Sequence, residues 1–334
     1  MKKTLILTII AIFFLGFYSC SDDSNNTPEP RTKSEMVTMG ANYENDIYYS
    51  LKNGVVAQVD RAEWDIAFAV NAMSSSILIN EASGVELKEF PTDDGWQWVA
   101  AIDTTRYSTW DALYNGDEDW EDGAFSANIN GEDYNYGWGV YDYMVTHNIN
   151  GVALYVIKLR NGDYKQIFIE KKQSVDQIYV FKFADLDGTN QQTVSLDVSD
   201  SNANFVYYNL ESNLKLNREP DASTWDLIFT KYIDNSIPYN VSGVIQNIGV
   251  EAIEIDDVAD LTLETYVDAE FDDNITEIGS DWKDFDMGSF TYVIDTDRMY
   301  FVKDQSENVY KIVFTGFEGS STGIVNFDIT DLSL

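Results

Sequence analysis

Histidine and cysteine, which often serve as nucleophile or base in enzymes, occur only once each in this 334-residue sequence, as His147 and Cys20. Because Cys20 is the only cysteine, no Cys–His pair is expected, and a Ser–His–Asp site would have to use His147. The carboxylates between residues 117 and 122 are best interpreted as solvated loop charge. Neither a phosphate-binding glycine loop nor zinc-ligand spacing is present. We therefore do not expect an enzyme.

Tryptophan and tyrosine are concentrated between residues 96 and 143, where they alternate with acidic residues and glycines. One interpretation is a long loop whose aromatic rings pack over one end of a β domain. The other is a ligand site, because loops on a rigid β scaffold commonly carry binding residues. The predicted pocket residues are Trp110, Trp120, Tyr134, Tyr136, Trp138 and Tyr141.

The chain begins with Lys2 and Lys3, followed by an apolar run from Leu5 to Tyr18 that is too short to span a membrane comfortably. The run ends at Ser19-Cys20, which resembles a bacterial lipoprotein cleavage site. We predict a signal peptide over residues 1–19, a lipidated Cys20 and a polar tether over residues 20–35. The alternative is an ordinary secretory peptide with an incidental cysteine.

The sequence carries 57 acidic and 21 basic residues, a formal net charge of −36. Such a surface should be repelled by nucleic acid and by anionic lipid headgroups, which excludes both as general partners. Calcium remains compatible with this charge. The loop from Asp185 to Asn190 faintly resembles a calcium loop, but turn chemistry accounts for it, and no metal site is predicted.

An internal repeat organises the sequence. Trp-Asp-Ile-Ala-Phe at 64–68 returns as Trp-Asp-Leu-Ile-Phe at 225–229, and Tyr-Tyr-Ser-Leu at 48–51 returns as Tyr-Tyr-Asn-Leu at 207–210. Because side chains alternate along a strand, we expect Trp64, Ile66 and Phe68 to share one face. The order of the landmarks predicts a tandem duplication, with one domain over residues 36–188, including the loop region 96–143, and another over 192–334.

Short strand signals separated by turn dipeptides predict an all-β fold of two tandem antiparallel β-sandwich-like domains. Asn53-Gly54 predicts a hairpin between strands at 47–51 and 55–59. Asn150-Gly151 and Asn161-Gly162 predict the two turns of a three-stranded meander over residues 144–170. A closing strand is expected at 177–183, and the second domain repeats the plan.

The combination of the Tyr-Tyr and Trp-Asp elements with Tyr164–Ile169, Tyr310–Phe314 and Gly323–Phe327 resembles the HmuY-type family of Bacteroidota lipoproteins. Asp22 and Asp23, just after Cys20, resemble the acidic signal that exports such lipoproteins to the cell surface. The resemblance implies a lipid-anchored protein of the outer membrane that binds haem as a cofactor. It also implies a partner, a TonB-dependent receptor, that receives the haem.

The resemblance further implies axial iron ligands, which are histidine in some family members and methionine in others. His147 is the sole histidine, so a histidine pair is excluded, and Met144 and His147 are the candidate haem-binding residues. Met287 and Met299 are loosely equivalent positions in the second domain. The competing interpretations are a surface module that binds carbohydrate or protein through its aromatic loops, and a passive structural domain.

Overall fold

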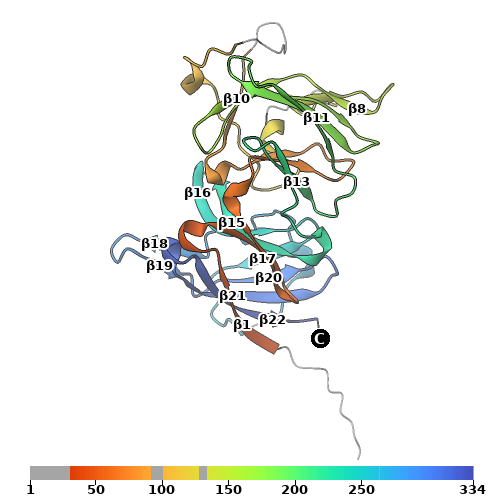
Figure 1. The fold of residues 1–334 in the computed structure, drawn as a ribbon. Helices are drawn as coiled ribbons and strands as arrows, with labels where there is room; N and C mark the ends of the chain where they lie inside the picture. Colours follow the sequence, from red (N-terminus) through yellow and green to blue (C-terminus); the bar gives the residue numbers. More distant parts are fainter. Residues whose placement is uncertain (1–30, 92–100, 128–133, 263, 334) are drawn as a thin grey trace, which may run out of the picture. The chain divides into compact units, whose positions relative to one another are not determined.

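The computed structural model describes residues 31–91, 101–127, 134–262 and 264–333. Within these ranges the secondary structure consists of β-strands and short 3₁₀ turns, which confirms the all-β prediction (Figure 1). The predicted signal peptide, Cys20 and residues 20–30 of the predicted tether lie outside the described residues, as do Trp96 and Trp98. Residues 31–35, expected to belong to the tether, instead form the start of the first strand.

The first lobe consists of two antiparallel sheets. Its larger, seven-stranded sheet contains β6 (Glu86–Glu89), β7 (Gly139–Tyr141), β8 (Asn148–Gly151), β9 (Leu154–Lys158), β10 (Tyr164–Gln173), β11 (Ile178–Asp185) and β12 (Gln192–Asp197). Its smaller sheet, in the order β14-β13-β4-β5, contains β4 (Ile66–Ala69), β5 (Ile77–Ile79), β13 (Phe205–Asn209) and β14 (Leu214–Leu216). One apolar core, which includes Phe68, Tyr155 and Phe181, joins the two sheets as a sandwich.

The second lobe repeats this plan. Its five-stranded sheet, in the order β1-β22-β21-β20-β17, contains β1 (Arg31–Thr38), β17 (Glu251–Ile255), β20 (Met299–Lys303), β21 (Val309–Phe317) and β22 (Ile324–Asp331). Its four-stranded sheet, in the order β16-β15-β2-β3, contains β2 (Asn45–Ser50), β3 (Gly54–Asp60), β15 (Leu227–Asp234) and β16 (Tyr239–Gln246). A separate hairpin pairs β18 (Lys283–Asp286) with β19 (Thr291–Ile294). The core of this lobe includes Tyr49, Phe229 and Phe327.

Single-turn 3₁₀ segments connect the strands. They are η1 (Ala41–Tyr43), η2 (Arg61–Glu63), η3 (Glu81–Ser83), η4 (Tyr107–Thr109), η5 (Ala124–Ser126), η6 (Ala222–Thr224), η7 (Asp268–Glu270) and η8 (Gly319–Ser321). None of the helical segments within the described residues has the length and apolar character needed to cross a membrane.

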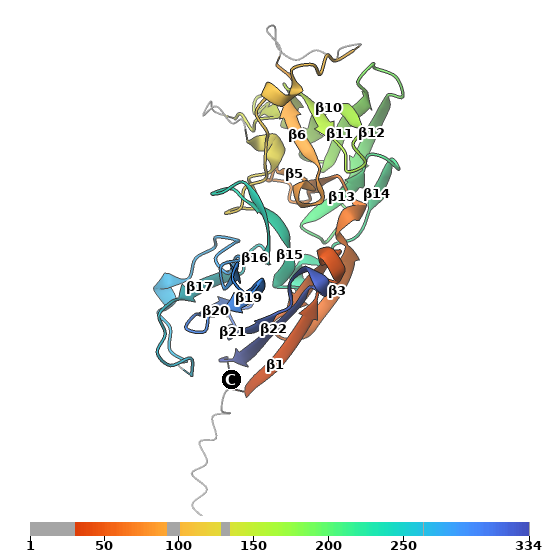
Figure 2. The same cartoon turned by 90° about the vertical axis from the view of Figure 1, so that its left-hand side faces the viewer.

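The sheets exchange strands between the two sequence repeats. β2, from the first repeat, pairs with β15 of the second, with Tyr49 opposite Leu227. β13, from the second repeat, pairs with β4 of the first, with Tyr208 opposite Ile66. β1 likewise lies beside the C-terminal β22, the red and blue strands of Figures 1 and 2. Each Trp-Asp strand therefore pairs with the Tyr-Tyr strand of the other repeat.

The side chain of Trp64 lies on the opposite face from the one predicted. Ile66 and Phe68 enter the core of the first lobe, whereas Trp64 packs with Ala67 on the other side of the sheet. The regular strand begins only at Ile66, because the chain bends at Asp65. Trp225 repeats the arrangement: it packs with Ile228, away from the core of the second lobe.

The hairpin at Asn53-Gly54 and the closing strand β11 confirm two predictions. The three-stranded meander is wrong in one respect, because Asn150-Gly151 lies within β8 rather than in a turn. β8 and β9 both pair with β10, at different positions along it. Gly151 is required there by close packing, since a Cβ atom would collide with the carbonyl oxygen of Ile169.

Candidate functional site

The six predicted pocket residues do not gather at one site. Trp138 is fully buried in the core of the first lobe, where its Nε1 donates to the Ser75 carbonyl oxygen at 2.9 Å, and Tyr136 packs against the same core. Trp110 packs against Phe90 and lines a groove with Arg106. Trp120 reaches the space between the two four-stranded sheets. Only Tyr134 and Tyr141 remain near each other and near His147.

The hairpin formed by β7 and β8 carries both predicted haem-binding residues. Asp142 closes its turn by accepting hydrogen bonds from the backbone N–H groups of Met144, Val145 and Thr146, at 3.1–3.2 Å. The backbone N–H of His147 completes the turn by donating to the Asp142 carbonyl oxygen. Met144 and His147 therefore lie in an exposed turn, whereas the sequence predicted a strand over 144–148.

His147 forms a hydrogen bond with a tyrosine on the same hairpin. Its Nδ1 lies 3.0 Å from Tyr141 Oη, so the second ring nitrogen, Nε2, is the one left to meet a ligand. A histidine that binds a metal commonly has its other ring nitrogen held by such a partner, which orients the ring. The pair has the chemistry of a histidine ligand with its supporting contact.

Exposed aromatic and apolar side chains surround this pair. The rings of Tyr134 and Tyr143 stack with centroids 4.6 Å apart, and Tyr134 lies 6.3 Å from Tyr141. Met144 is 74% exposed on the turn beside them. We call Tyr134, Tyr141, Tyr143, Met144 and His147 the hairpin patch. It offers an imidazole, a thioether, phenols and a flat apolar surface on one short segment.

The second lobe has a matching hairpin without the histidine. Asp286 closes the turn between β18 and β19 by accepting from Gly288 N at 2.8 Å, and Phe290 has the same φ of 56° as His147. Met287 is exposed here as Met144 is in the first lobe. Met299, in contrast, is buried in β20 and is not available to a ligand at the surface.

A buried ionic network links the two repeats between the lobes. Arg218 Nη2 lies 2.8 Å from Asp46 Oδ2, and Arg61 Nε lies 2.9 Å from Asp46 Oδ1. Burial alone would raise the pKa of Asp46, but Arg218 and Arg61 hold it below its ordinary value. Arg218 also contacts Glu63 at 3.1 Å. The charges of this network are paired, as burial requires.

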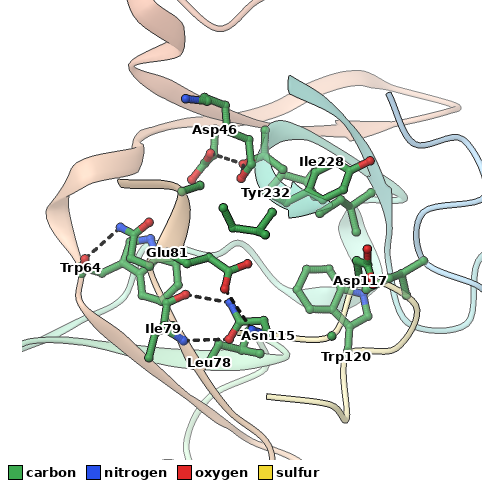
Figure 3. Close-up of a pocket in the computed structure, with 18 of the residues that line it drawn as sticks. Asp46, Trp64, Leu78, Ile79, Glu81, Asn115, Asp117, Trp120, Ile228 and Tyr232 are labelled. Carbon is green, nitrogen blue, oxygen red and sulfur yellow. Dashed lines mark hydrogen bonds between the residues drawn. The ribbon is translucent and has the colours of Figure 1, made fainter. Parts of the chain in front are cut away.

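Beside this network lies a cavity of about 100 Å³ between the sheets β14-β13-β4-β5 and β16-β15-β2-β3 (Figure 3). Trp64, Glu81 and Trp120 are among its lining residues, and of these the sequence indicated only Trp120. Burial raises the pKa of Glu81 to about 7, although the Asn115 backbone N–H donates to its carboxylate. The cavity was not predictable because its walls come from exchanged strands.

Within the described residues, no three side chains of histidine, cysteine, aspartate or glutamate gather closely enough to hold a metal ion. A group that brings its own ring of ligands, such as haem, needs only one or two protein ligands. The hairpin patch provides donors of the right chemistry.

No family model matches the chain, and no curated protein matches its sequence. Similar solved structures include apo PinO from Porphyromonas gingivitis, at 10% identity and a TM-score of 0.34 over 91% of this chain and 99% of that one. An HmuY-like haem-binding protein from Bacteroides vulgatus has 14% identity and a TM-score of 0.22, over 45% of this chain and 84% of that one. A lipoprotein from Bacteroides fragilis has 12% identity and a TM-score of 0.21, over 59% and 97%. The structural neighbours thus include HmuY-like and lipoprotein structures at low similarity.

Proposed function

We propose that this protein is a lipid-anchored, cell-surface lipoprotein that binds haem at the hairpin patch and passes it to a TonB-dependent receptor in the outer membrane. The observation that carries the proposal is the contact between Tyr141 Oη and His147 Nδ1 at 3.0 Å, on an exposed turn. Cys20 would carry the lipid, and the tether that follows would hold the folded lobes away from the membrane.

The residues present fit haem by their chemistry. His147 offers Nε2 to the iron, and Tyr141 holds the other ring nitrogen. Tyr134 and Tyr143 present stacked rings to a flat apolar macrocycle. Met144 adds an exposed thioether, another known haem ligand. Met144 and His147 lie on one tight turn, so we assign iron ligation to His147 alone and contact with the macrocycle to Met144.

The test is a titration of the purified mature protein with haemin, followed by absorbance in the Soret region. We expect saturable binding at micromolar haemin with one site per chain. His147→Ala should weaken it at least about tenfold, the effect of losing roughly 1.4 kcal/mol. Tyr141→Phe should retain some haemin binding but shift the Soret maximum, because His147 Nδ1 loses its hydrogen bond with Tyr141 Oη.

The second hairpin provides matched controls. Phe290→Ala changes the residue that occupies the position of His147, and Met287→Ala removes the exposed thioether of that hairpin. Neither substitution should alter the titration. Absence of a Soret shift in the unmodified protein would reject haem binding. If Phe290→Ala and His147→Ala reduce the affinity for haemin equally, the hairpin patch is rejected as the binding site.

Recognition of a carbohydrate or a protein is the second candidate function. The stacked Tyr134 and Tyr143 favour it, since they form an exposed aromatic platform on a strongly acidic protein without a requirement for iron. Retention on glycan columns, lost in Tyr134→Ala and unaffected by His147→Ala, would support this function over haem binding.

A further inference from the structure

The cavity between the two four-stranded sheets lies apart from the hairpin patch and shares none of its residues. Its volume is about 100 Å³. An engineered protein cavity of about 150 Å³ accommodates benzene, so this one has room for a group of roughly four or five non-hydrogen atoms. A whole haem or a whole sugar ring is too large, but the end of a larger ligand fits.

The walls of the cavity are mostly apolar. Aliphatic side chains come from both sheets, with Leu78 on β5 and Ile228 on β15, and Ile275 approaches from the loop before β18. Trp120 closes one side and is fixed in place, since its Nε1 donates to the carbonyl oxygen of Gln246 at 2.8 Å. These walls suit a methyl group or another small apolar end.

Trp64, Glu81 and Tyr48 contribute polar groups to the lining. The indole N–H of Trp64 is buried and has no hydrogen-bond acceptor among the residues that the structure describes. A buried donor without a partner costs free energy, and an indole N–H can only donate, so the missing partner must be an acceptor. Glu81 accepts a hydrogen bond from Asn115 N through Oε2 at 3.0 Å, and the backbone N–H of Ile233 also donates to this carboxyl group, whose oxygens have further lone pairs for a ligand. In contrast, Asp46 and Arg218 already satisfy each other.

The lining also includes Asp117, which lies beside Trp120 in Figure 3, and Asp119, on the same loop. Asp117 accepts hydrogen bonds from the backbone and side-chain nitrogens of Asn235, at 2.7 and 3.1 Å. The charges of Asp117 and Asp119 disfavour an anionic ligand. They favour hydroxyl and amide groups, which donate hydrogen bonds to carboxylates.

We propose that this cavity is a second binding site, which takes the acetamido group of an N-acetylated amino sugar. The carbonyl oxygen accepts from Trp64 Nε1, the amide N–H donates to Glu81, and the methyl group packs between the aliphatic walls. The sugar ring remains outside, where its hydroxyls meet Asp117 and Asp119. A purely apolar group would leave the indole unpaired, and a carboxylate would be repelled by the acids.

The experiment is a titration of the mature protein with N-acetylglucosamine, with glucosamine, glucose and N-acetyl-lysine amide as comparison ligands. Binding is followed through the indole N–H signals in ¹H–¹⁵N spectra, with the Trp64 signal assigned by its absence in Trp64→Phe. We expect saturable binding of N-acetylglucosamine, with a shift of the Trp64 indole signal. Glucosamine and glucose should bind at least about tenfold more weakly, since they lack the amide.

Trp64→Phe keeps an aromatic wall but removes the donor, and it should weaken binding about tenfold. Trp225→Phe is the matched control. The indole N–H of Trp225 is also buried and has no acceptor within the described part of the chain, but Trp225 does not line the cavity. Thermal unfolding of both variants checks that they are folded. Glu81→Ala should also weaken binding, because it removes the acceptor for the amide.

Several results would overturn the proposal. The first is absence of saturable binding of N-acetylglucosamine up to about 10 mM, a concentration that corresponds to a binding free energy of about 3 kcal/mol. The second is an equal loss of affinity in Trp64→Phe and Trp225→Phe. The third is tighter binding of N-acetyl-lysine amide than of the sugar. The last would assign the cavity to an acetylated peptide. Haemin titration of Trp64→Phe should match that of the unmodified protein. The haem site and the amino-sugar site are therefore tested independently, and rejection of one does not reject the other.

Discussion

The Asp65 carboxylate accepts a hydrogen bond from the backbone N–H of Leu210, with 2.7 Å between Oδ2 and N. Asp226 Oδ2 and Leu51 N form the reciprocal contact, at 2.8 Å. In each case the aspartate of one Trp-Asp motif binds the leucine that ends the Tyr-Tyr motif of the other repeat. The Trp-Asp motif of each repeat is thus hydrogen-bonded to the Tyr-Tyr motif of the other repeat, and the same contact occurs twice in the molecule.

Asp65→Ala should destabilise the protein by about 2 kcal/mol, because it leaves the buried Leu210 N–H without an acceptor. Asp65→Asn keeps an acceptor oxygen and should cost less. The measurement is the free energy of unfolding in urea, with exposed Asp176→Ala as the control. If Asp65→Ala and Asp176→Ala lower the free energy of unfolding by similar amounts, the contact between Asp65 and Leu210 does not stabilise the protein as proposed.

Exchange of strands predicts that neither repeat folds alone. A fragment of residues 31–190 lacks β15 and β13, which pair with β2 and β4, and a fragment of residues 191–334 lacks β4 and β2, which pair with β13 and β15. Each should show little near-ultraviolet circular dichroism, and a mixture of the two should recover it. Residues 62–219, which contain both sheets of the first lobe, serve as the comparison and should fold. Native-like spectra from either half by itself would refute the prediction.

Arg218→Met should destabilise the protein by about 3–5 kcal/mol, because it removes one of the two cations that compensate the buried Asp46 carboxylate. Adding Asp46→Asn should recover part of the loss, since the buried charge is then gone. Unfolding curves of the single and double variants measure this coupling, with exposed Lys52→Met as the control for charge removal alone. Strictly additive effects of the two substitutions would show that Asp46 and Arg218 are not coupled.

Glu81 should make stability depend on pH. Burial raises its pKa from 4.5 to about 7, so between these values the native state retains a proton that the unfolded chain has lost. The free energy of unfolding therefore falls as pH rises from 4.5 to 7, by up to about 3 kcal/mol from this group. Glu81→Gln removes the contribution and should be more stable than the unmodified protein at pH 8.

The pH prediction is checked by the difference in unfolding free energy between Glu81→Gln and the unmodified protein across pH 4–8, which cancels the other titrating groups. Exposed Glu211→Gln should give a flat difference. A flat difference for Glu81→Gln as well would show that the Glu81 carboxyl titrates normally.

Local patterns in the sequence determined the fold class, most strand positions and the repeat. Alternating apolar residues and the Asn53-Gly54 turn act over a few neighbours, so they can be recognised without the rest of the chain. The prediction that Asn150-Gly151 forms a turn failed for a non-local reason, because Gly151 allows β8 to approach Ile169 on β10. The exposed turn at Met144 and His147, in contrast, depends on local hydrogen bonds that Asp142 accepts from the residues just after it.

The tertiary structure alone decided which repeat supplies each strand and where the aromatic side chains point. The Tyr-Tyr strands are nearly the same in sequence, so either Trp-Asp strand could pair with either of them, and only the packed chain selects the exchange. Trp64 and Trp120 reach one cavity because that exchange brings two sheets together. Composition and spacing specify strands and their apolar faces, but contacts between residues more than a hundred positions apart depend on the packing of the whole chain.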